Sequence, residues 1–154
     1  MNCIKFALFL IRKGSKLEFK NHYGSVSIIT EGSIIIGQFS GNINARLVNN
    51  FATGLKKHVS ALAGRPWAYI SHSTHLLATT PDAERSFANL FRALQGTNCI
   101  ATAYMFSSSI VLNQMKRIIV EAEAPIQILD CLFDDLQSAK AYVLKQLEFA
   151  EMAC

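Results

Sequence analysis

The chain changes its hydrophobic period directly after the run Ile34-Ile35-Ile36-Gly37-Gln38-Phe39. That run is rich in β-branched residues, which is typical of a buried strand. The apolar residues that follow recur every three or four positions, which indicates one face of a helix. They are Ile43, Leu47, Phe51, Leu55, Val59 and Leu62. Because a buried strand leads directly into an amphipathic helix here, the sequence favours an α/β domain.

Two shorter strands are expected before this run. Residues 17–20 alternate apolar and polar side chains, and residues 26–30 are largely β-branched. Turn-forming residues stand at 21–24 and 31–33. Connections this short join neighbouring strands in opposite directions, so the first three strands are predicted to form an antiparallel meander.

Strands and helices alternate after the first helix. Strands are expected at 67–70, 99–106 and 126–132, with a linking loop at 71–79. Thr80-Pro81 is a helix start, since threonine caps helices and proline suits the first position. Ser107-Ser108-Ser109 can cap the next helix, and Asp134 with Gln137 forms a capping pair for the last. We therefore predict an α/β fold with a mixed β-sheet, antiparallel in its N-terminal meander and parallel afterwards, flanked by about four helices.

The length of 154 residues fits one domain, which we place at 15–154. Residues 1–14 are expected to be a flexible segment outside the domain, because residues 12–16 have the composition of a linker. An extra strand or a peripheral membrane contact are the alternatives for this segment. Its apolar run, residues 6–11, is far shorter than the roughly 20 residues that span a bilayer, so no stable membrane insertion is predicted.

The positive charge is confined to one end of the chain. Residues 1–20 contain five basic residues and one acidic residue, whereas the remainder contains ten of each. A body without net charge does not favour nucleic-acid binding. The four cysteines have neither metal-site nor disulfide-framework spacing, so we predict a cytoplasmic protein without metal or cofactor.

The candidate site lies past the carboxyl end of the fourth strand, the edge at which open α/β sheets bind ligands. Its members are Ser71, His72, Ser73, Thr74 and His75, joined by Ser107 and Ser108 from the end of the fifth strand. Two histidines three residues apart need further ligands before they hold a metal. No Gly-x-Ser-x-Gly or phosphate-binding motif accompanies the serines, so we predict a partner- or ligand-binding loop and no enzyme.

Three phrases in order carry a family resemblance. They are residues 32–41, residues 65–70 with Thr80-Pro81-Asp82-Ala83, and residues 124–126 with 132–139. Their order resembles the SpoIIAA-like group of the STAS superfamily. The resemblance implies a small cytoplasmic regulatory module, such as an anti-sigma factor antagonist. In such antagonists a serine in the region matching residues 71–75 is phosphorylated, but this chain lacks the acidic residue and the glycine of that phrase, and no phosphosite is assigned.

Two functions follow from these observations. The first is a regulatory module that binds a protein partner. The second is the binding of a small apolar ligand or lipid in an interior or sheet-edge pocket, because the chain has ten phenylalanines and isoleucine-rich strands. An apolar cavity of about 300 Å³ or more would favour the ligand. A homodimer formed through a sheet edge at residues 17–19 is compatible with both.

Overall fold

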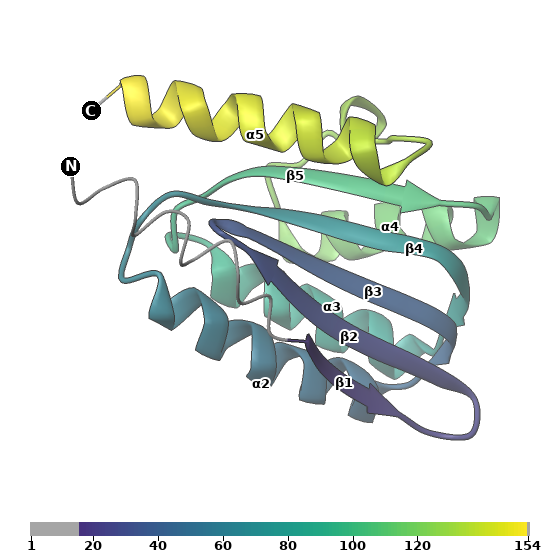
Figure 1. Cartoon of the computed structure of the whole chain (residues 1–154). Coiled ribbons are helices and arrows are strands. Elements are labelled where there is room, and N and C mark those ends of the chain that lie inside the picture. The colour runs from purple at the N-terminus through teal and green to yellow at the C-terminus, as the bar shows by residue number, and fades with distance from the viewer. Residues whose placement is uncertain (1–15, 154) are drawn as a thin grey trace.

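The structure is a computed structural model that describes residues 16–153, and its core is a five-stranded mixed sheet (Figure 1). The strands are β1 (Lys16–Lys20), β2 (Gly24–Glu31), β3 (Ile34–Ile43), β4 (Trp67–Thr79) and β5 (Cys99–Phe106). They lie in the order β1-β2-β3-β4-β5. The first three are antiparallel, and β3, β4 and β5 are parallel. The predicted mixed α/β sheet is therefore confirmed.

Within residues 16–153, four α-helices cover the two faces of the sheet (Figure 1). They are α2 (Ala45–Ala61), α3 (Pro81–Leu94), α4 (Ser109–Ala122) and α5 (Leu136–Met152). The first three form one layer, whose core includes Phe51, Trp67 and Tyr104. The opposite face packs against α5 through a separate core that includes Ile70 and Val143. The predicted number of helices is confirmed.

Side-chain caps fix where the helices begin. Thr80 Oγ1 accepts a hydrogen bond from Ala83 N at 3.2 Å, and Pro81 is the first residue of α3, as predicted. The predicted Asp134–Gln137 pair for the last helix is wrong. Asp135 is the cap, and its Oδ1 accepts from Ser138 N at 2.7 Å. Ser138 Oγ also donates to the second oxygen of Asp135 at 3.0 Å.

The sixth strand predicted at 126–132 is wrong. This segment instead contains a short 3₁₀ helix, η1 (Ile128–Asp130), and a single parallel bridge between Tyr104 and Leu132. The amides of Asp130 and Cys131 donate to carbonyls three residues earlier. These local turns use backbone groups that a strand would need for pairing with β5. Only two hydrogen bonds, at 2.8 and 2.9 Å, tie the segment to Tyr104.

The fourth strand is longer than predicted, because residues 71–79 are part of β4 and not a loop. The reason is the length of its neighbour. β3 continues past Phe39 to Ile43, and its last residues pair with β4 as far as Thr79. Register shifts after Gln38 and after Gly41 let the two strands stay paired.

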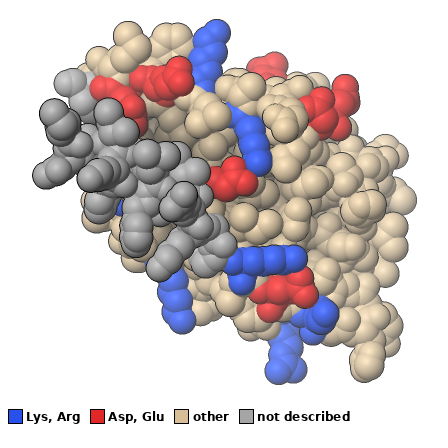
Figure 2. Space-filling view, in the orientation of Figure 1, with Lys and Arg blue, Asp and Glu red and all other residues tan. Residues whose placement is uncertain are grey.

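Charged side chains of both signs are interspersed on the face drawn in Figure 2. Along β1, Glu18 lies 3.4 Å from both Lys16 and Lys20. Arg117 of α4 pairs with Glu84 of α3 at 2.7 Å. The body of the molecule therefore has mixed surface charge, while the predicted absence of nucleic-acid binding stays a prediction.

Two further predictions concern the ends of the chain and the membrane. The predicted flexible segment, residues 1–14, lies outside the described residues. Within residues 16–153, no helix is both long and apolar enough to cross a bilayer. β1 does lie at a sheet edge, as the dimer hypothesis requires, but dimerisation and the cytoplasmic location stay predictions.

Candidate functional site

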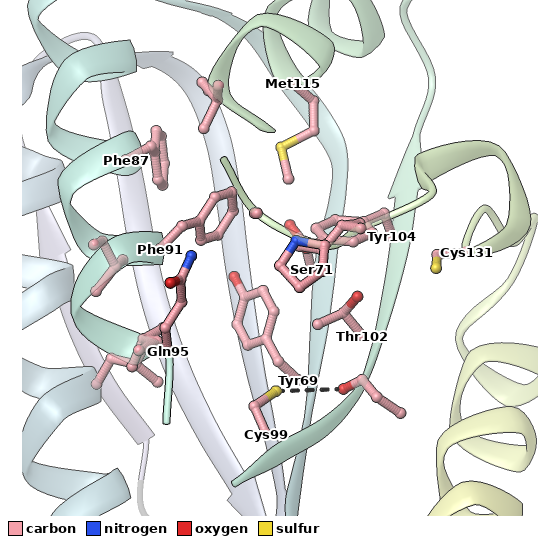
Figure 3. A pocket seen from close by; sticks show the side chains of 18 of the residues that line it. Tyr69, Ser71, Phe87, Phe91, Gln95, Cys99, Thr102, Tyr104, Met115 and Cys131 are labelled. Carbon is pink, nitrogen blue, oxygen red and sulfur yellow. Dashed lines mark hydrogen bonds between the residues drawn. The ribbon is translucent and has the colours of Figure 1, made fainter. Parts of the chain in front are cut away.

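A cavity of about 1050 Å³ lies between the sheet and the layer of α3 and α4 (Figure 3). β4 and β5 form its floor, and the chain after α4 closes one side with Pro125 and Ile126. Apart from Gln114, the side chains that α3 and α4 contribute to the lining are apolar, namely Phe87, Leu90, Phe91, Leu94, Val111, Met115 and Ile118. Figure 3 shows Phe87 and Phe91 of α3 and Met115 of α4 extending into this space.

Amphipathic helices place these side chains. Leu90 of α3 and Ile118 of α4 are buried. Phe87 and Phe91, on the same stripe of α3, are only partly buried, because the cavity lies where further packing would be expected. The apolar face of α3 therefore contributes both to the core and to the lining of the cavity. Met115 suits such a wall, since its flexible side chain adapts to irregular spaces.

Aromatic rings hold the floor of the cavity in place. Phe39 meets Phe51 at a centroid distance of 4.8 Å and Phe87 at 5.4 Å, both edge to face. Tyr69 lies 6.4 Å from Phe51 and 6.4 Å from Tyr104, again edge to face. Edge-to-face contacts of this kind favour one arrangement of the rings, so the floor is preorganised.

Polar side chains form a stripe across that floor. In the β4–β5 register Tyr69 is opposite Thr102 and Ser71 is opposite Tyr104, so these side chains share one face. Ser71 and Ser73 are both buried, and their Oγ atoms are hydrogen-bonded to each other at 2.8 Å. Burial raises the pKa of Tyr69 far above its usual range, and a hydrogen bond with the Ser71 side chain opposes this only in part.

Two hydroxyl oxygens of cavity-lining residues, Tyr104 Oη and Thr79 Oγ1, are buried and have no partner at ordinary hydrogen-bond geometry among the described residues. Burial raises the pKa of Tyr104 well above its usual range, and an interaction with the Thr102 hydroxyl opposes this only in part. The backbone at Thr79 is satisfied, because the Gln114 amide bonds its N–H at 3.0 Å and its C=O at 2.9 Å.

Two thiols also line the cavity. Cys99 Sγ donates a weak hydrogen bond to Ala101 O at 3.6 Å, and burial raises the pKa of this thiol to about 11. Burial also raises the pKa of Cys131. At neutral pH both groups are therefore thiols and poor nucleophiles. Both cysteines are partly buried.

The loop predicted at residues 71–75 does not exist as one site, because strand alternation, together with a register shift between His72 and His75, divides its members between two faces. Ser71 and Ser73 face the cavity. His72, Thr74 and His75 line a small polar depression elsewhere, together with Ser27 and Gln38. There Gln38 Nε2 is 3.3 Å from His72 Nδ1, and Ser27 Oγ donates to Gln38 Oε1 at 3.1 Å. Burial, followed by the charge of His75, lowers the pKa of His72.

The two serines predicted after the fifth strand do not join either site. Ser108 is the N-cap of α4, and its Oγ accepts from Ile110 N at 3.1 Å. Ser107 is exposed, and neither serine lines the cavity. Sequence reasoning missed Tyr69, Thr102 and Tyr104. The available signal was the alternation of tyrosine with serine or threonine along two neighbouring buried strands.

Within residues 16–153, no three histidine, cysteine or acidic side chains are grouped as metal ligands. The hydroxyls of the floor have neither a histidine nor a carboxylate among the neighbours that line the cavity with them, apart from exposed Glu123 at its edge. The site is thus suited to holding an apolar molecule by contact and by a few neutral hydrogen bonds.

No protein-family model matches the sequence, and no curated protein matches it significantly. Among solved structures, the chain is similar to an uncharacterized protein of the DUF3478 family with a SpoIIAA-like fold from Shewanella loihica PV-4. The match has a TM-score of 0.57 and 17% sequence identity, and it covers 80% of this chain and 97% of the other. At that identity the likeness concerns the fold alone. Together with the order of strands and helices, it shows that this chain has a SpoIIAA-like fold, as the resemblance in the sequence predicted.

Proposed function

We propose that this chain binds a small, mainly apolar molecule in the cavity between the sheet and α3 and α4. The observation that carries the proposal is the cavity itself, about 1050 Å³ in volume with apolar helix walls. Ligand pockets in proteins commonly measure about 300–1,000 Å³ and combine apolar walls with a few polar groups. The cavity is larger than the volume of about 300 Å³ above which we expected a ligand to be favoured.

The apolar lining supports the same proposal. The cavity is partly open to solvent, so water can enter it in the absence of a ligand. An apolar occupant that displaces this water gains about 25 cal/mol for each Å² of apolar surface that it removes from water.

The chemistry of the lining supports binding without catalysis. A nucleophile needs an adjacent base or a lowered pKa. Ser71 and Ser73 hydrogen-bond to each other, and the pKa of Cys99 is raised to about 11. The second hypothesis, a regulatory module with a protein partner, is compatible with a bound ligand and stays a prediction.

Titration with the neutral fluorescent probe N-phenyl-1-naphthylamine tests the proposal. We expect one saturable site per chain and enhanced probe emission. Thr102→Phe should weaken binding at least tenfold, because the ring fills part of the space above β5. Thr102→Val keeps the original volume and should bind the probe with nearly the affinity of the unmodified chain. Absence of saturable binding, or equal binding by Thr102→Phe and Thr102→Val, would contradict the proposal.

A further inference from the structure

We infer that the ligand enters the cavity at the edge of the sheet where β4 and β5 begin, and that a hydrogen bond from Arg92 to Glu121 O narrows this entrance and slows ligand exchange. The inference rests on the proposed function and adds the route of access to the same site. Three features carry it: the location of the exposed lining residues, the contacts that close the other sides, and the position of Arg92.

The exposed residues of the lining are all at one end of the cavity. They lie in the turn before β4, in residues 95–98 between α3 and β5, and in residues 123–127 after α4. Because α3 and α4 run back from the carboxyl ends of β4 and β5, these three segments meet at one edge of the sheet. The cavity therefore opens at the amino-terminal edge of β4 and β5, opposite the edge at which the sequence placed the binding loop.

Contacts close the other sides of the cavity. At the opposite edge, the Gln114 amide bonds both the N–H and the C=O of Thr79, at 3.0 and 2.9 Å. None of the described lining residues at that edge is exposed. Between the helices, Arg117 of α4 pairs with Glu84 of α3 at 2.7 Å. Beside β5, a backbone bridge holds the chain that follows η1.

Arg92 spans the entrance from α3 to α4. It lies in the last turn of α3, and its guanidinium donates to Glu121 O in the last turn of α4 at 2.6 Å. A second N–H donates to Asn89 Oδ1 at 2.8 Å, which holds the side chain in this direction. Gln95 (Figure 3) and Glu123, which line the entrance, follow Arg92 and Glu121 along the chain. The bond therefore ties together the two helix ends that border the entrance.

This tie is the one that opens at the lowest cost. Arg92 and Glu121 are both exposed, so water can replace their hydrogen bond when the ends of α3 and α4 separate. The bonds between Gln114 and Thr79 are partly buried and lack this replacement. Segments with exposed hydrogen bonds open locally more readily than core elements. We therefore assign ligand exchange to the end of the cavity that Arg92 spans.

Stopped-flow fluorescence with N-phenyl-1-naphthylamine tests the inference. Arg92→Met removes the bond and should raise the association and dissociation rates together by about tenfold, the factor that corresponds to one hydrogen bond. The dissociation constant should then change little. Arg85→Met is the matched control, because Arg85 is exposed near the other end of α3 and pairs with Asp82. It should leave both rates unchanged.

A second pair of variants tests the location of the entrance without altering Arg92. Gln127→Trp places a large ring at the entrance and should slow association and dissociation together. Asn113→Trp adds the same ring at an exposed position of α4 that does not line the cavity, and it should leave both rates unchanged.

The outcomes separate this inference from the proposed function. Equal rates in Arg92→Met and Arg85→Met, or in Gln127→Trp and Asn113→Trp, overturn the inference and leave the apolar site intact. Weaker binding by Arg92→Met without faster association also overturns it, because the bond would then hold the cavity walls and not the entrance. An unmodified chain that does not bind the probe overturns the proposed function and this inference with it.

Discussion

Gly37 leaves room for the hydroxyl of Tyr69 beneath the cavity. A Cβ atom on Gly37 would lie 2.6 Å from Tyr69 Oη and 3.0 Å from the ring of Phe51. We expect Gly37→Ala to lower the free energy of unfolding by about 1–3 kcal/mol, the usual cost of overpacking a core. Urea unfolding of the purified variant measures this change.

A double variant distinguishes this contact from a general effect of the substitution. Tyr69→Phe removes the hydroxyl that meets the new methyl group, so its cost should be smaller in the Gly37→Ala background than alone. Additive costs, within about 0.5 kcal/mol, would show that Gly37 and Tyr69 are not coupled.

His72 makes stability depend on pH in a defined direction. Burial and the charge of His75 lower its pKa below 6.5 in the folded chain. The unfolded chain therefore takes up the proton first as pH falls. The contribution of neutral His72 to stability is present above pH 6.5 and is lost as pH falls below that value.

His72→Gln removes this titration. We expect the difference in unfolding free energy between the unmodified chain and His72→Gln to be constant above about pH 7 and to shift in favour of the variant at lower pH. Urea unfolding between pH 8 and pH 5 measures it. A difference that does not change with pH would show that the pKa of His72 is the same in both states.

Sequence reasoning at the residue scale identified Ser71 and Ser73 but not their surroundings. It grouped them with His72, because a polar stretch after an apolar strand is typical of a loop. In a strand, successive side chains point to opposite faces, so that group was divided.

At the scale of single elements, the start of α3 depends on one side-chain cap. Thr80→Ala removes the hydrogen bond from Ala83 N to Thr80 Oγ1 and should lower the free energy of unfolding by about 1 kcal/mol. Thr80→Ser retains the hydroxyl and is the matched control. If Thr80→Ser destabilised the chain as much as Thr80→Ala, the cap would not be the cause.

Elements with local signals were predictable from the sequence. α3 begins with its capping threonine and proline, and β5 coincides with the predicted strand at 99–106. The errors concern pairing over long range. β4 extends to Thr79 because the end of β3 pairs with it, and no pattern within residues 71–79 contains that information. Residues 126–132 have strand-like composition. Their backbone amides nevertheless form local turn hydrogen bonds, where a sixth strand would have paired them with β5.

At the scale of the whole molecule, helices on both faces of a mixed sheet followed from the order of strands and helices. The cavity did not. Ten phenylalanines and isoleucine-rich strands are compatible with a filled core and equally with a lined pocket. The difference depends on how far α3 and α4 stand from β4 and β5, which is a matter of total side-chain volume and helix placement.

A crystal structure determined under xenon pressure shows whether the cavity between the sheet and α3 and α4 can hold an apolar occupant, because xenon enters apolar cavities without needing a specific ligand. We predict xenon between the polar floor of β4 and β5 and the apolar wall formed by Phe87, Phe91 and Met115. A crystal in which these side chains pack against the sheet, with no xenon or other occupant between them, would contradict it.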